Sequence, residues 1–145
     1  MVDSMNLYID CEFNGFGGQL ISMALVAEDG TEFYEVVPLL EEVTPWVAEH
    51  VMPVLNKDAV SPHNFKQKLY RFINRYSEVH IIADWPDDIR YFCEALIVGP
   101  GVMKHTPEKM TMEINRKINC ISRIPHNALE DARANAEYMI GAKYQ

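Results

Sequence analysis

The hydrophobic pattern of the first forty residues is typical of β-strands. Residues 6–10 form a short apolar run that ends in an acid, which indicates a buried strand. Two more runs rich in strand-forming residues follow, separated by Glu28-Asp29-Gly30-Thr31. Because Asp-Gly between two such runs is a hairpin signal, the pattern predicts three successive strands in an antiparallel meander.

Helical spacing begins after the third strand. Thr44 followed by Pro45 predicts a capped helix over about residues 45–51. Apolar residues at helical spacing predict a second helix that leads into a strand over residues 78–84; these residues are Phe65, Leu69, Phe72, Ile73 and Tyr76.

Helix and strand alternate in the second half of the chain. Residues 89–98 have helical spacing and end at a Pro100-Gly101 loop, and residues 110–114 are compatible with a strand. The last helix follows Asn127, which has Glu130 three residues on, the pattern of a capping box. Three strands followed by alternating elements predict an α/β fold, with one mixed sheet flanked by α-helices.

Composition fits a soluble enzyme or binding module. The chain has 145 residues, 48% hydrophobic and 23% charged, which predicts a single domain over residues 1–145. No apolar stretch approaches the roughly 18 residues of a membrane span, and the first residues do not resemble a signal peptide. Three cysteines without metal-ligand spacing, Cys11, Cys93 and Cys120, favour a cytoplasmic location.

The charge distribution is uneven. The net charge is −8, which argues against a broad basic surface for nucleic acid. Residues 1–60 carry Lys57 as their only Lys or Arg, so the positive charge lies later in the chain. The locally basic segment 104–123 is either a guide for a phosphate backbone or a solvated face.

Candidate chemistry starts with two acids in "LYIDCEFNG". Asp10 and Glu12 are two residues apart on a strand, so their side chains project from the same face. Two carboxylates on one face repel each other unless solvent or a cation separates them, and Mg²⁺ prefers such oxygen ligands. The pair alone is compatible with a metal site or with an exposed strand end.

Two other acidic groups follow later in the chain. Asp84, Asp87 and Asp88 lie where a strand gives way to a helix, and acids there also serve as caps and favour the helix dipole. We interpret Asp87 in that way. His126 precedes the last helix and Asp131 lies one turn inside it, so both side chains can face one cleft.

Together these motifs resemble those of the DEDDh family of 3′–5′ exonucleases. The matching residues are Asp10-Cys11-Glu12, Asp88 in "DWPDDIRYF", and His126 with Asp131 in "HNALEDARANA". The resemblance spans nearly the whole chain and is nearest in look to the small ribonuclease AS subgroup. It implies a ribonuclease H-like fold, with antiparallel first strands and parallel later ones. Many members of the family carry Asn where Asp84 stands here.

The resemblance also implies a mechanism with two metal ions. Asp10, Glu12, Asp88 and Asp131 would bind two Mg²⁺ or Mn²⁺ ions. His126 would act as general base toward the attacking water. The products would be nucleoside 5′-monophosphates, released one at a time from the 3′ end.

Substrate contacts are expected next to the metal ligands. The loop "FNGFGGQ" contains three glycines, which let a ligand approach the backbone closely. We assign Phe13, Asn14, Gly15 and Phe16 to nucleotide binding, with one phenylalanine stacking on a base; Phe13 in the core is the alternative. Asp84 and Trp85 are expected to line the same cleft, with packing favoured over base stacking as the role of Trp85.

The expected partner is the 3′ end of single-stranded RNA. The resemblance to the subgroup favours RNA over DNA and adds a preference for adenylate-rich ends, with a homodimer among the expectations. Two alternatives stay open: a DNA exonuclease of proofreading type, and a nuclease-like protein that binds without catalysis. No membrane partner is expected.

Overall fold

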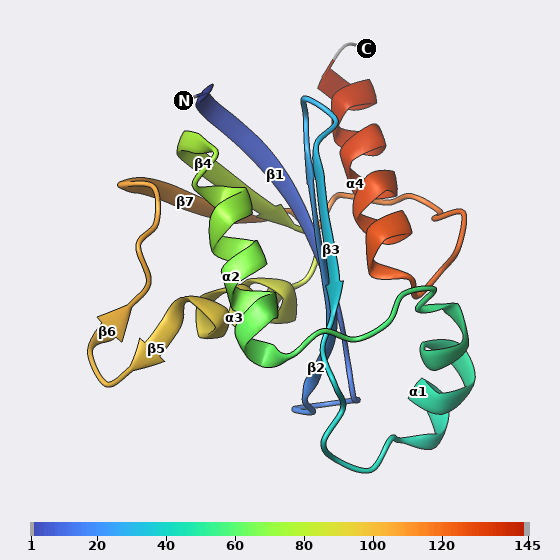
Figure 1. Ribbon diagram of the computed structural model, residues 1–145. Helices are drawn as coiled ribbons and strands as arrows, with labels where there is room; N and C mark the ends of the chain where they lie inside the picture. Colours follow the sequence, from blue (N-terminus) through green and yellow to red (C-terminus); the bar gives the residue numbers. More distant parts are fainter. Residues whose placement is uncertain (1, 144–145) are drawn as a thin grey trace.

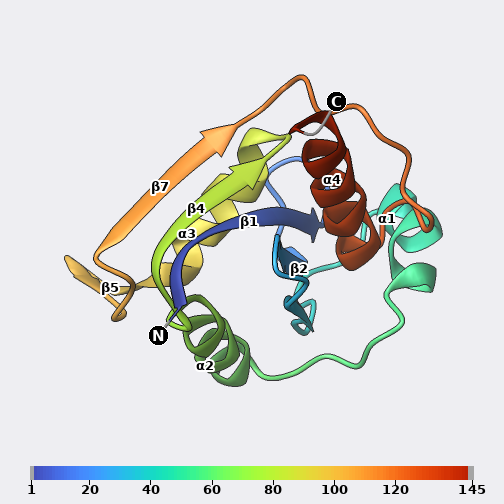
Figure 2. The same ribbon diagram turned by 90° about the horizontal axis from the view of Figure 1, so that it is seen from above.

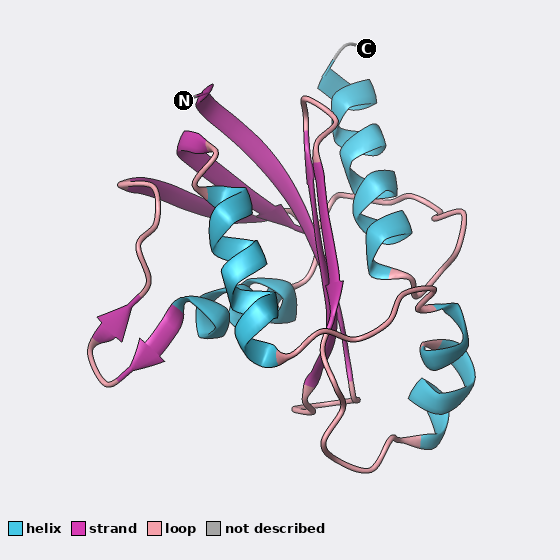
Figure 3. Cartoon of the chain, viewed as in Figure 1, coloured by secondary structure: helices cyan, strands magenta, loops and turns pink. Residues whose placement is uncertain are grey.

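The computed structural model describes residues 2–143 and shows a five-stranded sheet with helices on both faces (Figures 1 and 3). The strand order is β3-β2-β1-β4-β7, and a separate two-stranded hairpin pairs β5 with β6. In chain order the elements are β1 (Val2–Phe13), β2 (Leu20–Ala27), β3 (Glu32–Val36), α1 (Pro45–His50), η1 (Met52–Val54), α2 (Pro62–Ile73), β4 (Tyr76–Ala83), α3 (Pro86–Leu96), β5 (Ile97–Gly99), β6 (Val102–Met103), β7 (Lys109–Ile114) and α4 (Ala128–Lys143).

The mixed sheet confirms the predicted fold class at the level of α/β architecture. β1, β2 and β3 pair antiparallel, with Asp10 opposite Ala24 in the β1–β2 register. β4 then pairs parallel with β1, and β7 pairs parallel with β4. The sheet is therefore antiparallel in its first three strands and parallel afterwards, as the alternation of elements predicts.

The two faces of the sheet have different covers. One face packs against α2 and α3 and uses the odd-numbered residues of β1, such as Leu7 and Ile9. The other face packs against the alanines of α4, with Tyr8 of β1 beneath them. Figure 2 shows α4 on the opposite side of the strands from α2 and α3. The even-numbered residues of β1, including Asp10 and Glu12, therefore face α4.

Most predicted boundaries are correct to within a few residues. β1 extends beyond residues 6–10 at both ends, and Tyr76 belongs to β4 rather than to the helix before it. The hairpin β5–β6 is not predicted, because Ile97 and Val98 continue the helical spacing of α3. None of the helices within residues 2–143 is long and apolar enough to cross a membrane.

The capping box at the start of α4 forms only in part. Asn127 accepts a hydrogen bond from the backbone N–H of Glu130 (2.9 Å), as predicted. The reciprocal bond is replaced, because the Asn127 N–H already donates to the carbonyl of Ile124. The Glu130 carboxylate instead accepts a hydrogen bond from Arg133 (2.6 Å).

Candidate functional site

Asp10, Glu12 and Asp131 form the first acidic cluster, at the contact between β1 and α4. Alanines at positions 128, 132 and 136 are buried against the sheet, and their small side chains let α4 approach it closely. Asp131 is adjacent to that alanine stripe, so its carboxylate lies over β1. One oxygen from each of the three acids lies within 4.8 Å of the others.

The second cluster consists of Asp10, Asp84 and Asp88, with the same 4.8 Å limit between ligand atoms. Asp88 lies in the first turn of α3 and is only 2% exposed. The backbone N–H of Cys11 donates to its Oδ1 (2.9 Å), which ties α3 to β1. Asp10 belongs to both clusters and therefore joins the two halves of the site.

Burial and mutual repulsion raise the pKa values of these carboxyl groups. For Asp10 burial is the main cause and the charge of Asp88 the next. Burial, followed by the charge of Asp131, raises the pKa of Glu12 to about 9. Burial also raises the pKa of Asp88 to about 8, and burial is the largest cause of the raised pKa of Asp131. The site therefore disfavours four negative charges in the absence of a cation.

The free oxygens of the clusters suit a hard divalent cation. Asp10 Oδ2 and Asp88 Oδ2 are buried and have no hydrogen-bond partner among the described residues. An unpaired buried carboxylate oxygen is costly, and carboxylate oxygens are the ligands that Mg²⁺ and Mn²⁺ prefer. The residues present thus fit two such ions that share Asp10.

His126 lies at the edge of the acidic clusters. Its backbone N–H donates to Asp131 Oδ2 (3.2 Å), and its φ of 71° lies in the left-handed region. Trp46 contacts the imidazole ring edge-on, with 4.9 Å between centroids, and also stacks on His50 at 4.5 Å. Residues of α1 therefore contact the imidazole ring, while the backbone N–H of His126 bonds to α4.

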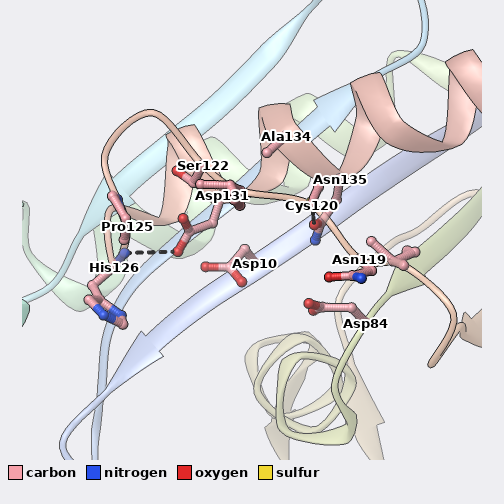
Figure 4. Close-up of a pocket in the computed structure, with 12 residues that line it drawn as sticks. Asp10, Asp84, Asn119, Cys120, Ser122, Pro125, His126, Asp131, Ala134 and Asn135 are labelled. Atoms are coloured by element: carbon pink, nitrogen blue, oxygen red, sulfur yellow. Dashed lines mark hydrogen bonds between the residues drawn. The ribbon is translucent and has the colours of Figure 1, made fainter.

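A cavity of about 330 Å³ opens over the first strand. Figure 4 shows Asp10 in its middle, His126 toward one end and Asp84 toward the other. Residues of the loop before α4 form much of the wall; they are Ile118, Asn119, Cys120, Ile121, Ser122 and Pro125. The cavity brings an acid cluster and a histidine to one opening, which suits hydrolysis of a bond held near Asp10.

The predicted loop residues separate into two groups. Phe13 packs against Tyr91 (5.1 Å between ring centroids), so it belongs to the core, as the alternative interpretation has it. Asn14 is 5% exposed and bonds to the segment that precedes α1. Gly15 adopts a positive φ of 77° beside Thr44. Phe16 is fully exposed.

Asp84 and Trp85 both adjoin the second cluster. Asp84 lies in the cluster and lines the cavity. Trp85 is 48% exposed, and its indole N–H donates to Asp87 (2.8 Å). Arg116 stacks on Trp85 at 4.6 Å and donates to the Asp84 carbonyl. One residue of the basic segment therefore lies beside the acids.

The sequence interpretation missed Trp46 and His50. They lie four residues apart on α1, so they share one helix face, and this spacing is the only local signal of their role. Their contact with His126 spans about 80 residues of chain and depends on how α1 packs.

Comparisons with known proteins assign no family to this chain. No protein-family model matches the chain, and no curated protein matches it either.

Proposed function

We propose that this protein is a metal-dependent 3′–5′ exoribonuclease with a ribonuclease H-like fold. The observation that carries the proposal is that Asp10 belongs to two acidic clusters, one with Glu12 and Asp131 and one with Asp88, and lines a single cavity together with Asp131 and His126. They come from β1, α3 and α4 and the residue that precedes its cap. A shared Asp10 between two clusters suits a pair of ions, and such pairs act on phosphodiester bonds.

The acidic side chains would hold the two ions in two groups that share Asp10. Asp10, Glu12 and Asp131 would hold one Mg²⁺ or Mn²⁺, and Asp10 with Asp88 and Asp84 would hold the other. Bound there, the two ions supply activation of a water molecule and stabilisation of the leaving 3′-oxygen. The Cys11 N–H binds Oδ1 of Asp88 and leaves its Oδ2 without a hydrogen-bond partner among the described residues, so that oxygen would be available to an ion.

His126 is the proposed general base. Imidazole titrates near neutral pH and can take a proton from the attacking water at the edge of the cluster. Its backbone bond to Asp131 and its ring contact with Trp46 limit where the imidazole can lie. Attack on the terminal phosphodiester would release a nucleoside 5′-monophosphate.

The proposed substrate is the 3′ end of single-stranded RNA. An acidic protein suits contact with a few terminal nucleotides better than contact with a long duplex. Phe16, fully exposed at the loop tip, would stack on a base. Preference for RNA, and for adenylate at the end, follows the resemblance of the motifs; a DNA exonuclease is the enzymatic alternative.

The test compares 5′-labelled single-stranded RNA and DNA incubated with Mg²⁺ or Mn²⁺. We expect stepwise shortening of RNA from the 3′ end. Asp10→Asn should abolish it, and His126→Asn should slow it by about 10²–10⁴-fold, the usual contribution of a general base. A series of RNAs with different 3′ bases then measures the adenylate preference.

Matched controls separate the site from general effects of substitution. Asp87→Asn removes an acid next to Asp88 that belongs to neither cluster, and His63→Asn removes an exposed histidine on α2. Both controls should trim RNA at the wild-type rate. Wild-type protein that binds metal and trims neither polymer would exclude catalysis and leave a binding protein.

A further inference from the structure

Arg116 is held beside the acidic clusters without a carboxylate partner of its own. β4 and β7 run parallel as far as Ala83 and Ile114, and the Asn115 N–H extends their pairing by donating to the Ala83 carbonyl (2.7 Å). Arg116 follows directly, and its guanidinium donates to the carbonyl of Asp84. It forms no ion pair with any acid among residues 2–143. An exposed arginine in a chain of net charge −8 therefore keeps most of its N–H groups unbonded.

Trp85 fixes the direction of that guanidinium. The guanidinium carbon of Arg116 lies 4.6 Å from the centroid of the Trp85 ring. The indole N–H in turn donates to Asp87 (2.8 Å). Because the side chain is already held by the ring and by the Asp84 carbonyl, it loses little freedom when it binds an anion. A guanidinium held in this way suits a phosphate, which accepts two parallel N–H bonds from it.

The cavity itself offers no basic side chain to a phosphate. None of the twelve residues that line it is a lysine or an arginine, and three of them are aspartates. The proposed ions would offset the charge of the scissile phosphate only. The next phosphate of an RNA strand would meet an acidic surface and would be repelled unless a cation lies beside it. Arg116 supplies that cation at the rim, next to Asp84.

The geometry of the proposed reaction indicates which phosphate this is. In an in-line displacement the attacking water and the leaving oxygen lie on opposite sides of the phosphorus. Figure 4 shows Asp10 in the middle of the cavity, with His126 toward one end and Asp84 toward the other. Since the water would lie at His126, the leaving 3′-oxygen would lie toward Asp84. The nucleotide that carries this oxygen stays on the strand, so the RNA would continue past Asp84 to Arg116.

We propose that Arg116 binds the second phosphate from the 3′ end, the one directly upstream of the scissile phosphate. This inference rests on the proposed function. Hydrolysis there joins the water oxygen to the phosphorus of the last linkage, breaks the bond to the 3′-oxygen and leaves that oxygen as a hydroxyl. The contact would fix the direction of the strand, with its 3′ end at His126. Because a phosphate contact carries no sequence information, it should act on every RNA alike.

A neutral linkage tests the contact at a single phosphate. The measurement is kcat/KM for removal of the last nucleotide from a short 5′-labelled RNA whose second linkage from the 3′ end is either a phosphate or a neutral methylphosphonate. The nucleoside on the 5′ side of that linkage carries a 2′-deoxy sugar in both RNAs, because a neighbouring hydroxyl would attack the neutral linkage. Wild-type protein should trim the neutral RNA about 5–20-fold more slowly.

Arg116→Ala should slow trimming of the unmodified RNA by the same factor and should lose all sensitivity to the neutral linkage, since both changes remove one interaction. Its rate on the neutral RNA should equal that of the wild type, which excludes general damage to the fold. Arg90→Ala is the matched control, because Arg90 also stacks on an aromatic ring, that of Tyr91 at 4.9 Å, but does not line the cavity. It should behave as the wild type does.

A neutral third linkage checks the position along the strand. Arg116→Ala should still slow trimming of that RNA by about 5–20-fold, because the second phosphate is intact. If Arg116→Ala trims RNA and still distinguishes a charged from a neutral second linkage as the wild type does, this inference is wrong and the proposed function stands.

The salt dependence of RNA binding gives a measurement that does not require trimming. In a His126→Asn background with Mg²⁺, Arg116→Ala should reduce the slope of log affinity against log salt by about 0.7, the value for one phosphate contact on a single strand. Arg90→Ala should leave the slope unchanged. RNA binding with the same slope after Arg116→Ala would overturn the contact. A wild-type protein that neither binds nor trims RNA would overturn both this inference and the proposed function.

Discussion

Contacts with neighbouring residues, more than its own backbone, fix the position of His126. Its φ of 71° is unusual for a residue other than glycine, and its N–H is committed to Asp131. The imidazole itself touches the rings of Trp46 and His50, with 4.9 Å and 6.1 Å between centroids. Trp46 therefore acts as a positioning residue for the proposed general base.

Replacement of Trp46 by Ala should lower kcat for RNA trimming by about 10–100-fold, because a misplaced general base loses much of its effect. KM should change much less, since the acids that would hold the ions stay in place. Trp46→Phe, which keeps an aromatic edge, should recover most of the rate. Equal losses in the two variants, or a loss confined to KM, would contradict a positioning role.

Individual residues show which parts of the site were predictable. The motif selects Asp88 over Asp87; Asp88 is buried in one cluster with Asp10, whereas Asp87 belongs to neither cluster of the described residues and accepts the Trp85 indole N–H. The spacing of residues within a motif and the caps of helices involve residues that are near one another in the sequence, so they can be predicted from the sequence. Trp46 could not be assigned, because its contact with His126 exists only after α1 packs against the loop before α4.

At the scale of elements, the loop after β1 and the segment before α1 form one unit. The Asn14 amide donates to Glu41 Oε1 (3.0 Å) and to the Glu42 carbonyl (2.9 Å), and its oxygen accepts the Thr44 N–H (2.9 Å). Thr44 in turn caps α1. The loop that presents Phe16 is therefore coupled to the helix that carries Trp46.

Gly18→Ala tests this coupling. A Cβ at position 18 would lie 2.0 Å from the Asn14 carbonyl oxygen, so the loop must shift. We expect a loss of about 2–4 kcal/mol in the free energy of unfolding, together with slower trimming.

Gly141→Ala is the matched control: it lies in α4 with no atom within 4 Å of the added Cβ. It should stabilise the protein by about 0.5–1 kcal/mol, since alanine favours a helix. Urea unfolding measures both, and a neutral Gly18→Ala would contradict the coupling.

Element predictions succeeded where one periodicity dominates and failed where two overlap. α2 and α4 carry clear helical patterns and caps, and β2 and β3 flank an Asp-Gly turn. In β5, two β-branched residues follow α3 without a break in helical spacing. The extended backbone of Ile97 and its pairing with Met103 of β6 show that the helix ends at Leu96. That pairing is a tertiary contact, and the local sequence carries no signal of it.

At the scale of the whole molecule, acidic groups act on stability in opposite directions. Hydrogen bonds from Thr31 lower the pKa of Asp29, and those from Arg133 lower the pKa of Glu32. Both groups stabilise the fold above about pH 4 and lose that contribution as the pH falls through their folded values. The buried cluster does the reverse, because its folded pKa values lie above those of an unfolded chain. The metal-free protein should therefore be most stable in mildly acidic solution.

Above about pH 4 the unfolded chain releases the protons of Glu12 and Asp88, whereas the folded chain keeps them up to about pH 9 and about pH 8. The folded state then binds more protons, so the free energy of unfolding falls as the pH rises through this window. With EDTA, the Tm should be at least about 5 °C lower at pH 9 than at pH 5.5.

Mg²⁺ at about 100 times its Kd should restore about 2.7 kcal/mol of the free energy of unfolding at pH 9. Glu12→Gln should flatten the pH dependence and weaken the response to Mg²⁺, whereas Glu49→Gln, at an exposed position on α1, should change neither. A metal-free Tm that is equal or higher at pH 9 would show that the cluster is not buried as described.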